Sequence, residues 1–332
     1  MPDCSAEFRN AEGAAPIATT DARRSYRHEA FLWRTADDFL DASIPFIRDG
    51  LDAGEPVMVA VIPERIALLR AALGEDAERV HFVDMAELGR NPAHIIPGWQ
   101  RFLDAHSGSG QPMRGIGEPI WAGRRREEIV ECQLHEALLN VAVDPKLPFW
   151  LLCPYNSDLL DDEVIEEAHR SHPAVIQADA DRGSPLYGGL EHVEHFFGSS
   201  LPELKGEAHQ LHFNRTTLQR ILPFVAARAL TGGVAPDQAA DLAVSAHHVA
   251  ASSLQRAARG GVVRLWQRPD AVICEVRDLT WVSDPLAGRR LTSRGERDGL
   301  WLANQTYDLV QLRSTRTGTT VRMHHWTQRS VA

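Results

Sequence analysis

The sequence predicts an α/β domain followed by a smaller α+β domain, and three features indicate this. The runs 56–62 and 148–156 are continuously apolar, which is typical of parallel strands buried on both faces. Stretches with helical spacing of apolar residues separate these and other short apolar runs. Near the carboxyl end, two helical stretches precede strands that are joined by tight turns, as in a two-layer α+β domain. The length of 332 residues also suits two domains.

We expect a flexible tail at residues 1–25 and the α/β domain at 26–175. Residues 36–54 predict a helix that ends at a glycine, and 63–74 a helix with proline in its first turn. The other elements expected here are strands at 28–33, 56–62, 80–85, 113–121 and 148–156, and helices at 92–106, 125–143 and 161–172. This alternation of strands and helices indicates a parallel sheet covered by helices on both faces.

Residues 176–209 are rich in Gly, Ser and Pro and are expected to link the two domains. The second domain is expected at 210–326. It begins with helices at 214–233 and 235–260, and two strands follow that are split by a turn at 268–270. A loop with short helical character and a hairpin that turns near Gly318 complete it.

Composition and charge narrow the functional classes. The net charge of −10 argues against nucleic acid as the main partner, because phosphate backbones require a basic field. The amino-terminal residues lack the apolar segment of a signal peptide, and no apolar run is long enough to span a membrane. Four scattered cysteines form no CxxC pair, so we expect a cytoplasmic protein without a disulfide framework.

The first domain, at about residues 26–175, contains the motifs "HEAFLW", "PVMVAVIP", "VDMAELGRNPAHIIPGW", "GIGEPIW", "CQLHEALLN" and "CPYN". In these motifs it resembles the MEDS sensory domain of methanogen and methylotroph sensors. This resemblance implies a RecA-like fold, but "IPERI" stands where a phosphate-binding P-loop would follow the strand. The resemblance therefore implies a sensor of a small-molecule signal.

The second domain contains the motifs "CEVRD", "DPLAGRR", "GLWLANQ", "DLVQLRS" and "GTTVRM". In these motifs and in the order of its elements it resembles the histidine-kinase-like (GHKL) ATPases, in particular the anti-sigma serine kinases. This resemblance implies a regulator of transcription whose partner is a sigma factor or an anti-sigma antagonist, with ATP and Mg²⁺ as cofactors if the site is intact. The sequence leaves the oligomeric state open, a homodimer included.

The metal-binding helix of that family is altered here. His248 stands where the family has its activating glutamate, and Ser252 stands where an asparagine binds Mg²⁺. Imidazole near its ordinary pKa can act as a base, but Mg²⁺ prefers oxygen ligands. The alternative reading is that the two histidines at 247–248 only cover a helix face.

The nucleotide-binding motifs also depart from the family pattern. Asp278 is retained where an aspartate contacts adenine, but Thr280 and Val282 replace glycines, and Trp281 is expected to fill the adenine space. Gly299 of the lid and Thr319 of the final motif match the family. The departures predict that kinase activity is lost, and they leave ATP binding in question. The alternatives are an active serine kinase that uses His248 as its base, and a histidine kinase that uses His135.

Candidate ligand-sensing residues lie in the first domain. Carboxyl ends of parallel strands form ligand crevices, so Glu118, Cys153, Tyr155 and the loop after Asp84 are expected around one cleft. His28, together with Cys132 and Glu136 on one helix face, adds potential metal or haem ligands, but their spacing matches no standard metal site. We therefore predict no metal and interpret both cysteines as small buried hydrophobes.

The connector contains two pairs of histidines, His192 with His195 and His209 with His212. We interpret these pairs as part of a solvated segment. "EHVEHFF" also has the pattern of a short amphipathic helix that docks one domain on the other.

Overall fold

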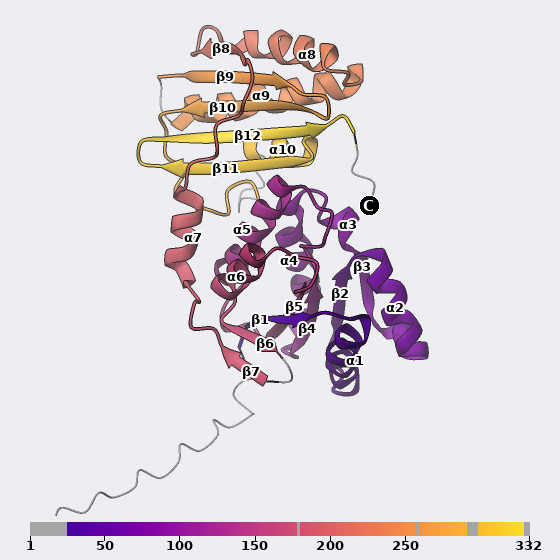
Figure 1. Ribbon diagram of the computed structural model, residues 1–332. Helices are drawn as coiled ribbons and strands as arrows, with labels where there is room; N and C mark the ends of the chain where they lie inside the picture. The colour runs from indigo at the N-terminus through magenta and orange to yellow at the C-terminus, as the bar shows by residue number, and fades with distance from the viewer. Residues whose placement is uncertain (1–24, 178–179, 257–258, 291–297, 329–332) are drawn as a thin grey trace, which may run out of the picture.

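The computed structural model describes residues 25–177, 180–256, 259–290 and 298–328, and the predicted tail lies almost wholly outside them. The chain forms an α/β domain and an α+β domain stacked on it. Among the strands of the second domain, β11 lies nearest to helix α5 of the first (Figure 1). Both predicted fold classes are confirmed.

The first domain is built on a sheet with the order β3-β2-β4-β5-β1-β6-β7. Its first six strands are parallel, and β7 pairs antiparallel with β6. The strands are β1 (Arg27–Trp33), β2 (Val57–Val61), β3 (His81–Asp84), β4 (Met113–Gly117), β5 (Phe149–Asn156), β6 (Ala174–Gln177) and β7 (Ala180–Gly183). The helices are α1 (Ala36–Asp52), α2 (Pro63–Leu73), α3 (Met85–Leu88), α4 (Ile95–His106), α5 (Arg126–Ala142) and α6 (Asp162–Ser171).

Helices cover both faces of this sheet, which explains the apolar strand sequences. Every residue of β2 is buried. Leu51 of α1 and Leu69 of α2 belong to the core on one face, and Leu138 of α5 belongs to the core on the other. The prediction of a doubly covered parallel sheet is therefore confirmed.

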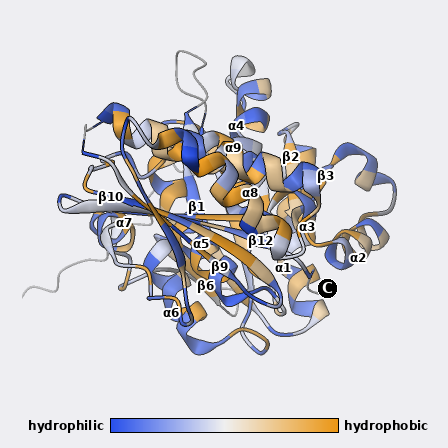
Figure 2. Ribbon diagram, turned by 90° about the horizontal axis from the view of Figure 1, so that it is seen from above, coloured by the Kyte–Doolittle hydropathy of each residue, from blue (hydrophilic) through white to orange (hydrophobic). Residues whose placement is uncertain are grey.

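The second domain has the antiparallel sheet order β11-β12-β10-β9-β8. The strands are β8 (His209–Phe213), β9 (Gly261–Gln267), β10 (Ala271–Asp278), β11 (Leu309–Thr315) and β12 (Gly318–Trp326). The helices are α8 (Ile221–Thr231), α9 (Pro236–Arg256) and α10 (Gly299–Thr306). Side chains of all three helices join one core with the sheet, and α8 and α9 lie side by side in the view from above (Figure 2).

The predicted linker is packed against both domains. Besides β7, it contains helix α7 (Gly189–Gly198), which places Val193 in the core of the first domain and Phe197 in that of the second. The docking helix expected in this segment is thus confirmed. His192 pairs with the Glu167 carboxylate of α6, so it is not the solvated side chain that we predicted.

No helix in the described part of the chain combines the length and the apolar character that crossing a bilayer requires.

Candidate functional site

Four polar side chains meet in the interior of the first domain. His28 comes from β1, Glu136 from α5, Cys153 from β5, and His172 directly follows α6. His28 Nε2 lies 3.0 Å and His172 Nε2 3.3 Å from Glu136 Oε2, while Cys153 Sγ lies 3.4 Å from His28 Nε2. None of the four residues is more than 2% exposed. We call this set the buried cluster.

Neighbouring groups orient both imidazole rings. His172 Nδ1 lies 2.8 Å from the backbone oxygen of Ala168, which only accepts, so Nδ1 carries the proton. His28 Nδ1 lies 3.1 Å from Asn140 Oδ1, and the amide nitrogen of Asn140 donates to the Ser171 oxygen at 2.8 Å. Each ring therefore directs the lone pair of Nε2 into the cluster.

Burial sets the charge states around the cluster. Burial and the neighbouring His172 lower the pKa of His28, and burial raises the pKa of the Cys153 thiol. Burial also opposes ionisation of Glu136, but when His172 and His28 are protonated their Nε2–H groups face its carboxylate and bring the carboxyl pKa below its ordinary value. The cluster thus gathers two imidazole nitrogens, a thiol and a carboxylate whose ligand atoms all lie within 4.8 Å of one another.

The structure unites some of the predicted sensing residues and separates others. His28, Cys153 and Glu136 are together, and Tyr155 packs edge-on against His172, with ring centroids 5.7 Å apart. Cys132 is excluded from the cluster and packs in the apolar core, as we predicted for it.

Glu118 lies elsewhere, so the prediction of one cleft is wrong. Its carboxylate accepts from the Ile62 amide at 3.4 Å and faces Arg65 of α2 at 3.8 Å. Cys153 instead faces α5, on the other side of the sheet. Alternate residues of a strand point to opposite faces of the sheet. Glu118, which follows β4, and Cys153 of the adjacent strand β5 therefore lie on different faces although the two strands are neighbours.

Glu118 lies where β2 and β4 pair but their following helices cover opposite faces of the sheet. Such a switch point is where open α/β sheets bind ligands. A cavity of about 790 Å³ opens beside it, lined by Ile62 and Pro63 after β2 and by Ala86 and Glu87 after β3. Of the residues predicted around one cleft, only those of the loop after Asp84 line this cavity.

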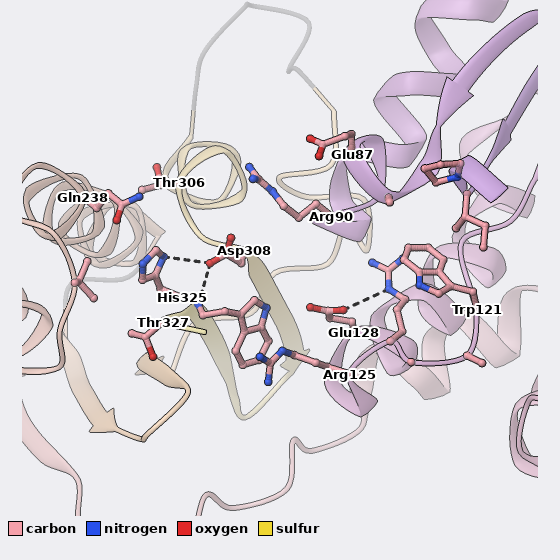
Figure 3. A pocket seen from close by; sticks show the side chains of 18 of the residues that line it. Glu87, Arg90, Trp121, Arg125, Glu128, Gln238, Thr306, Asp308, His325 and Thr327 are labelled. Atoms are coloured by element: carbon pink, nitrogen blue, oxygen red, sulfur yellow. Dashed lines mark hydrogen bonds and ion pairs between the residues drawn. The ribbon is translucent and has the colours of Figure 1, made fainter. Parts of the chain in front are cut away.

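The second domain closes this cavity. Figure 3 shows side chains from both domains around it, including Arg90, Trp121, Glu128, Asp308 and His325. Asp308 accepts from the Trp326 amide at 2.9 Å and lies 3.1 Å from His325 Nδ1. The lining combines aromatic surfaces with charges of both signs, which suits a small polar ligand.

The Glu118 carboxyl predicts a pH-dependent stability. Burial raises its pKa from 4.5 to about 7, which corresponds to about 3 kcal/mol. As the pH rises, Glu118 loses its proton in the unfolded chain before it does so in the folded chain. Its contribution to the free energy of unfolding is therefore fully present below pH 4.5 and is lost as the pH rises through about 7. Glutamine does not titrate, so the free energy of unfolding of Glu118→Gln minus that of the unaltered chain should rise by about 3 kcal/mol between about pH 4 and 8. Urea unfolding at a series of pH values measures this difference. Exposed Glu194→Gln serves as the control, and a difference independent of pH would contradict the assignment.

Comparison with known proteins identifies the first domain. Residues 27–173 match the family model described as MEDS: MEthanogen/methylotroph, DcmR Sensory domain. Over these residues the chain is similar to the MEDS family, and we call this part the MEDS domain. The match confirms the resemblance seen in its motifs, whereas the likeness of the second domain to GHKL ATPases stays a prediction. No curated protein matches the chain significantly.

A buried ion-pair network joins the MEDS domain to the second domain. Glu131 of α5 is 0% exposed and lies 3.0 Å from Arg289 Nη2 and 2.6 Å from Arg313 Nη2. Both arginines are buried as well, and Gln311 of β11 contacts the same carboxylate at 3.4 Å. Glu131 was not among the residues predicted from the sequence, because its partners Arg289, Gln311 and Arg313 belong to the other domain.

Further polar contacts surround this network. Asn91 donates to the Asn304 backbone oxygen at 3.0 Å and to the Tyr307 oxygen at 3.3 Å. Arg125 pairs with Asp270 at 2.8 Å and lies over the Trp326 ring at 4.2 Å. These contacts fix the relative placement of the two domains.

Three of the residues predicted at the ATP site, Gly299, Ser252 and His248, lie where α10 meets α9. The Gly299 amide donates to Ser252 Oγ at 3.3 Å. A side-chain carbon at Gly299 would lie 2.4 Å from the His248 backbone oxygen, so α10 packs directly on α9. The His248 side chain itself is exposed. The lid residues 291–297 lie outside the described residues.

Local hydrogen bonds occupy the remaining residues of this site. Asp278 accepts from both the amide and the hydroxyl of Thr280, and the Thr319 hydroxyl donates to the Thr280 oxygen at 2.8 Å. Trp281 is 47% exposed and lies beneath Arg316. The expectation that Trp281 fills an adenine pocket is therefore wrong, because its ring faces solvent.

Proposed function

We propose that the chain is a signalling regulator in which the MEDS domain senses a small molecule and the second domain binds a protein partner. By its motifs the partner is a sigma factor or an anti-sigma antagonist in the cytoplasm. The net charge of −10 supports a protein partner over nucleic acid.

The Glu131 network is the observation that supports this proposal most strongly. Helix α5 carries Glu131 at the domain interface and Glu136 in the buried cluster. A shift of α5 changes the contacts of Glu131 with Arg289 and Arg313, and packed interfaces of this kind have discrete arrangements. One helix therefore connects the interior of the sensor to the second domain.

The inter-domain cavity is the proposed signal site. Its walls come from the strand ends of the MEDS domain and from residues of the second domain such as Gln238 and Thr327. A ligand held by both domains stabilises one relative arrangement of them, to the extent of its preference for that arrangement.

We propose that partner binding has replaced phosphoryl transfer. The Gly299 amide bonds to Ser252 where a Mg²⁺ ligand and a phosphate would otherwise meet. Asp278 is bonded to Thr280 and is not directed at a base. Phosphoryl transfer depends on positioning and electrostatic stabilisation, so these local bonds oppose it.

This predicts that the full chain shows no binding of Mg-ATP in isothermal titration and no transfer of labelled γ-phosphate to a partner protein. His248→Ala should behave like the unaltered chain in both measurements. Micromolar binding with phosphorylation of a partner serine, abolished by His248→Ala, would instead establish the alternative, an active serine kinase.

A further inference from the structure

We propose that His28, Glu136, Cys153 and His172 form a closed Zn²⁺ site in the MEDS domain. The four ligand atoms come from separate elements, and all lie within 4.8 Å of one another in a region closed to solvent. Four protein ligands without an open position are typical of structural zinc sites.

The distances fit a tetrahedral ion. Zinc bonds of about 2.0–2.1 Å to N and O, and about 2.3 Å to S, give tetrahedral edges of about 3.3–3.6 Å. The contacts to Glu136 Oε2 are 3.0 Å from His28, 3.3 Å from His172 and 3.5 Å from Cys153. Small shifts of these side chains are sufficient to place one ion between them.

The hydrogen bonds around the cluster are those of a metal site. Metal-binding imidazoles usually donate their second N–H to a carbonyl or carboxylate, which directs the free lone pair at the ion. Asn140 Oδ1 and the Ala168 oxygen receive these N–H groups from His28 and His172. Glu136 Oε1 has no hydrogen-bond donor among the described residues.

Charge balance favours a divalent ion with affinity for sulfur and nitrogen. A thiolate and a carboxylate neutralise Zn²⁺ together, and the thiol proton leaves on binding, so the buried complex is neutral. Mg²⁺ and Ca²⁺ prefer oxygen ligands, whereas an imidazole, thiolate and carboxylate set suits zinc. The ion would hold α5 against β1, β5 and the end of α6.

The test uses the full chain, purified without metal-affinity resin or chelator. Elemental analysis should find about one zinc per chain. Replacement by Co²⁺ should give the visible bands of a tetrahedral site and a sulfur-to-cobalt charge-transfer band. Cys153→Ser should abolish the charge-transfer band, while Cys132→Ser, a buried cysteine outside the cluster, should retain it.

A second variant keeps the proposal testable if Cys153→Ser does not fold. Asn140→Ala leaves all four ligands in place, removes the acceptor of the His28 Nδ1 proton and the amide that donates to Ser171, and should weaken Zn²⁺ binding about 10–100-fold in a chelator competition. The proposal is wrong if the folded chain binds no stoichiometric zinc and Co²⁺ gives no charge-transfer band. It is equally wrong if the Co²⁺ spectrum is the same in Cys153→Ser, or if Asn140→Ala binds zinc as tightly as the unaltered chain.

Discussion

Replacing Glu131 with alanine is expected to lower the free energy of unfolding by about 3–5 kcal/mol. The substitution leaves Arg289 and Arg313 buried at the interface without their carboxylate, which is 3.0 and 2.6 Å away in the unaltered chain. An unpaired buried charge keeps its desolvation cost and loses the interaction that offset it. Chemical unfolding followed by circular dichroism measures the loss.

Two controls isolate the unpaired charges as the cause. Glu194→Ala removes an exposed helical glutamate of α7 and should change stability by no more than about 0.5 kcal/mol. Combining Glu131→Leu with Arg289→Met and Arg313→Met removes all three charges and should be less destabilising than Glu131→Ala alone. If the triple variant loses as much as the single variant, packing and not charge explains the effect.

Trp99→Ala is expected to cost about 3–5 kcal/mol, the usual loss for a buried tryptophan. Trp99 of α4 is 1% exposed and packs on the sheet. A side-chain carbon at Gly115 would lie 2.8 Å from its ring, and one at Gly117 would lie 3.0 Å away. These glycines have no side chains that could fill the space left by the indole, so the cavity persists.

Trp281→Ala provides the matched control for this prediction. Its ring is 47% exposed and contacts Arg316 at 4.7 Å, an exposed cation–π contact of about 0.5–1 kcal/mol. Thermal and urea unfolding should therefore separate the two tryptophans clearly. Equal losses in the two variants would contradict the packing of α4 on β4.

The sequence was sufficient to predict most elements of both domains because their apolar patterns are local, but the short strands β6, β7 and β8 were not expected. A continuously apolar run such as 57–61 is stable as a strand only when both faces of the sheet are covered. In the structure all five of these residues are buried. The strand order could not be predicted in the same way. The placement of β1 between β5 and β6 depends on pairing between residues more than a hundred positions apart.

The candidate site was only partly predictable for the same reason. His28 and Cys153 were among the predicted sensing residues, but His172 was only the last residue of a predicted helix. Its position beside His28 follows from the register of β1 and β6, in which Glu29 pairs with Ala174. A histidine two residues before the start of β6, which begins at Ala174, was the signal available in the sequence.

The central claim is that Glu131 couples the MEDS domain to the second domain, and hydrogen exchange measures this directly. Exchange followed by mass spectrometry should compare Glu131→Ala with Glu194→Ala and the unaltered chain under native conditions. We expect Glu131→Ala to lower protection in both α5 and β11, which carries Gln311 and Arg313. Faster exchange confined to α5, with β11 and α10 unchanged, would contradict the claim.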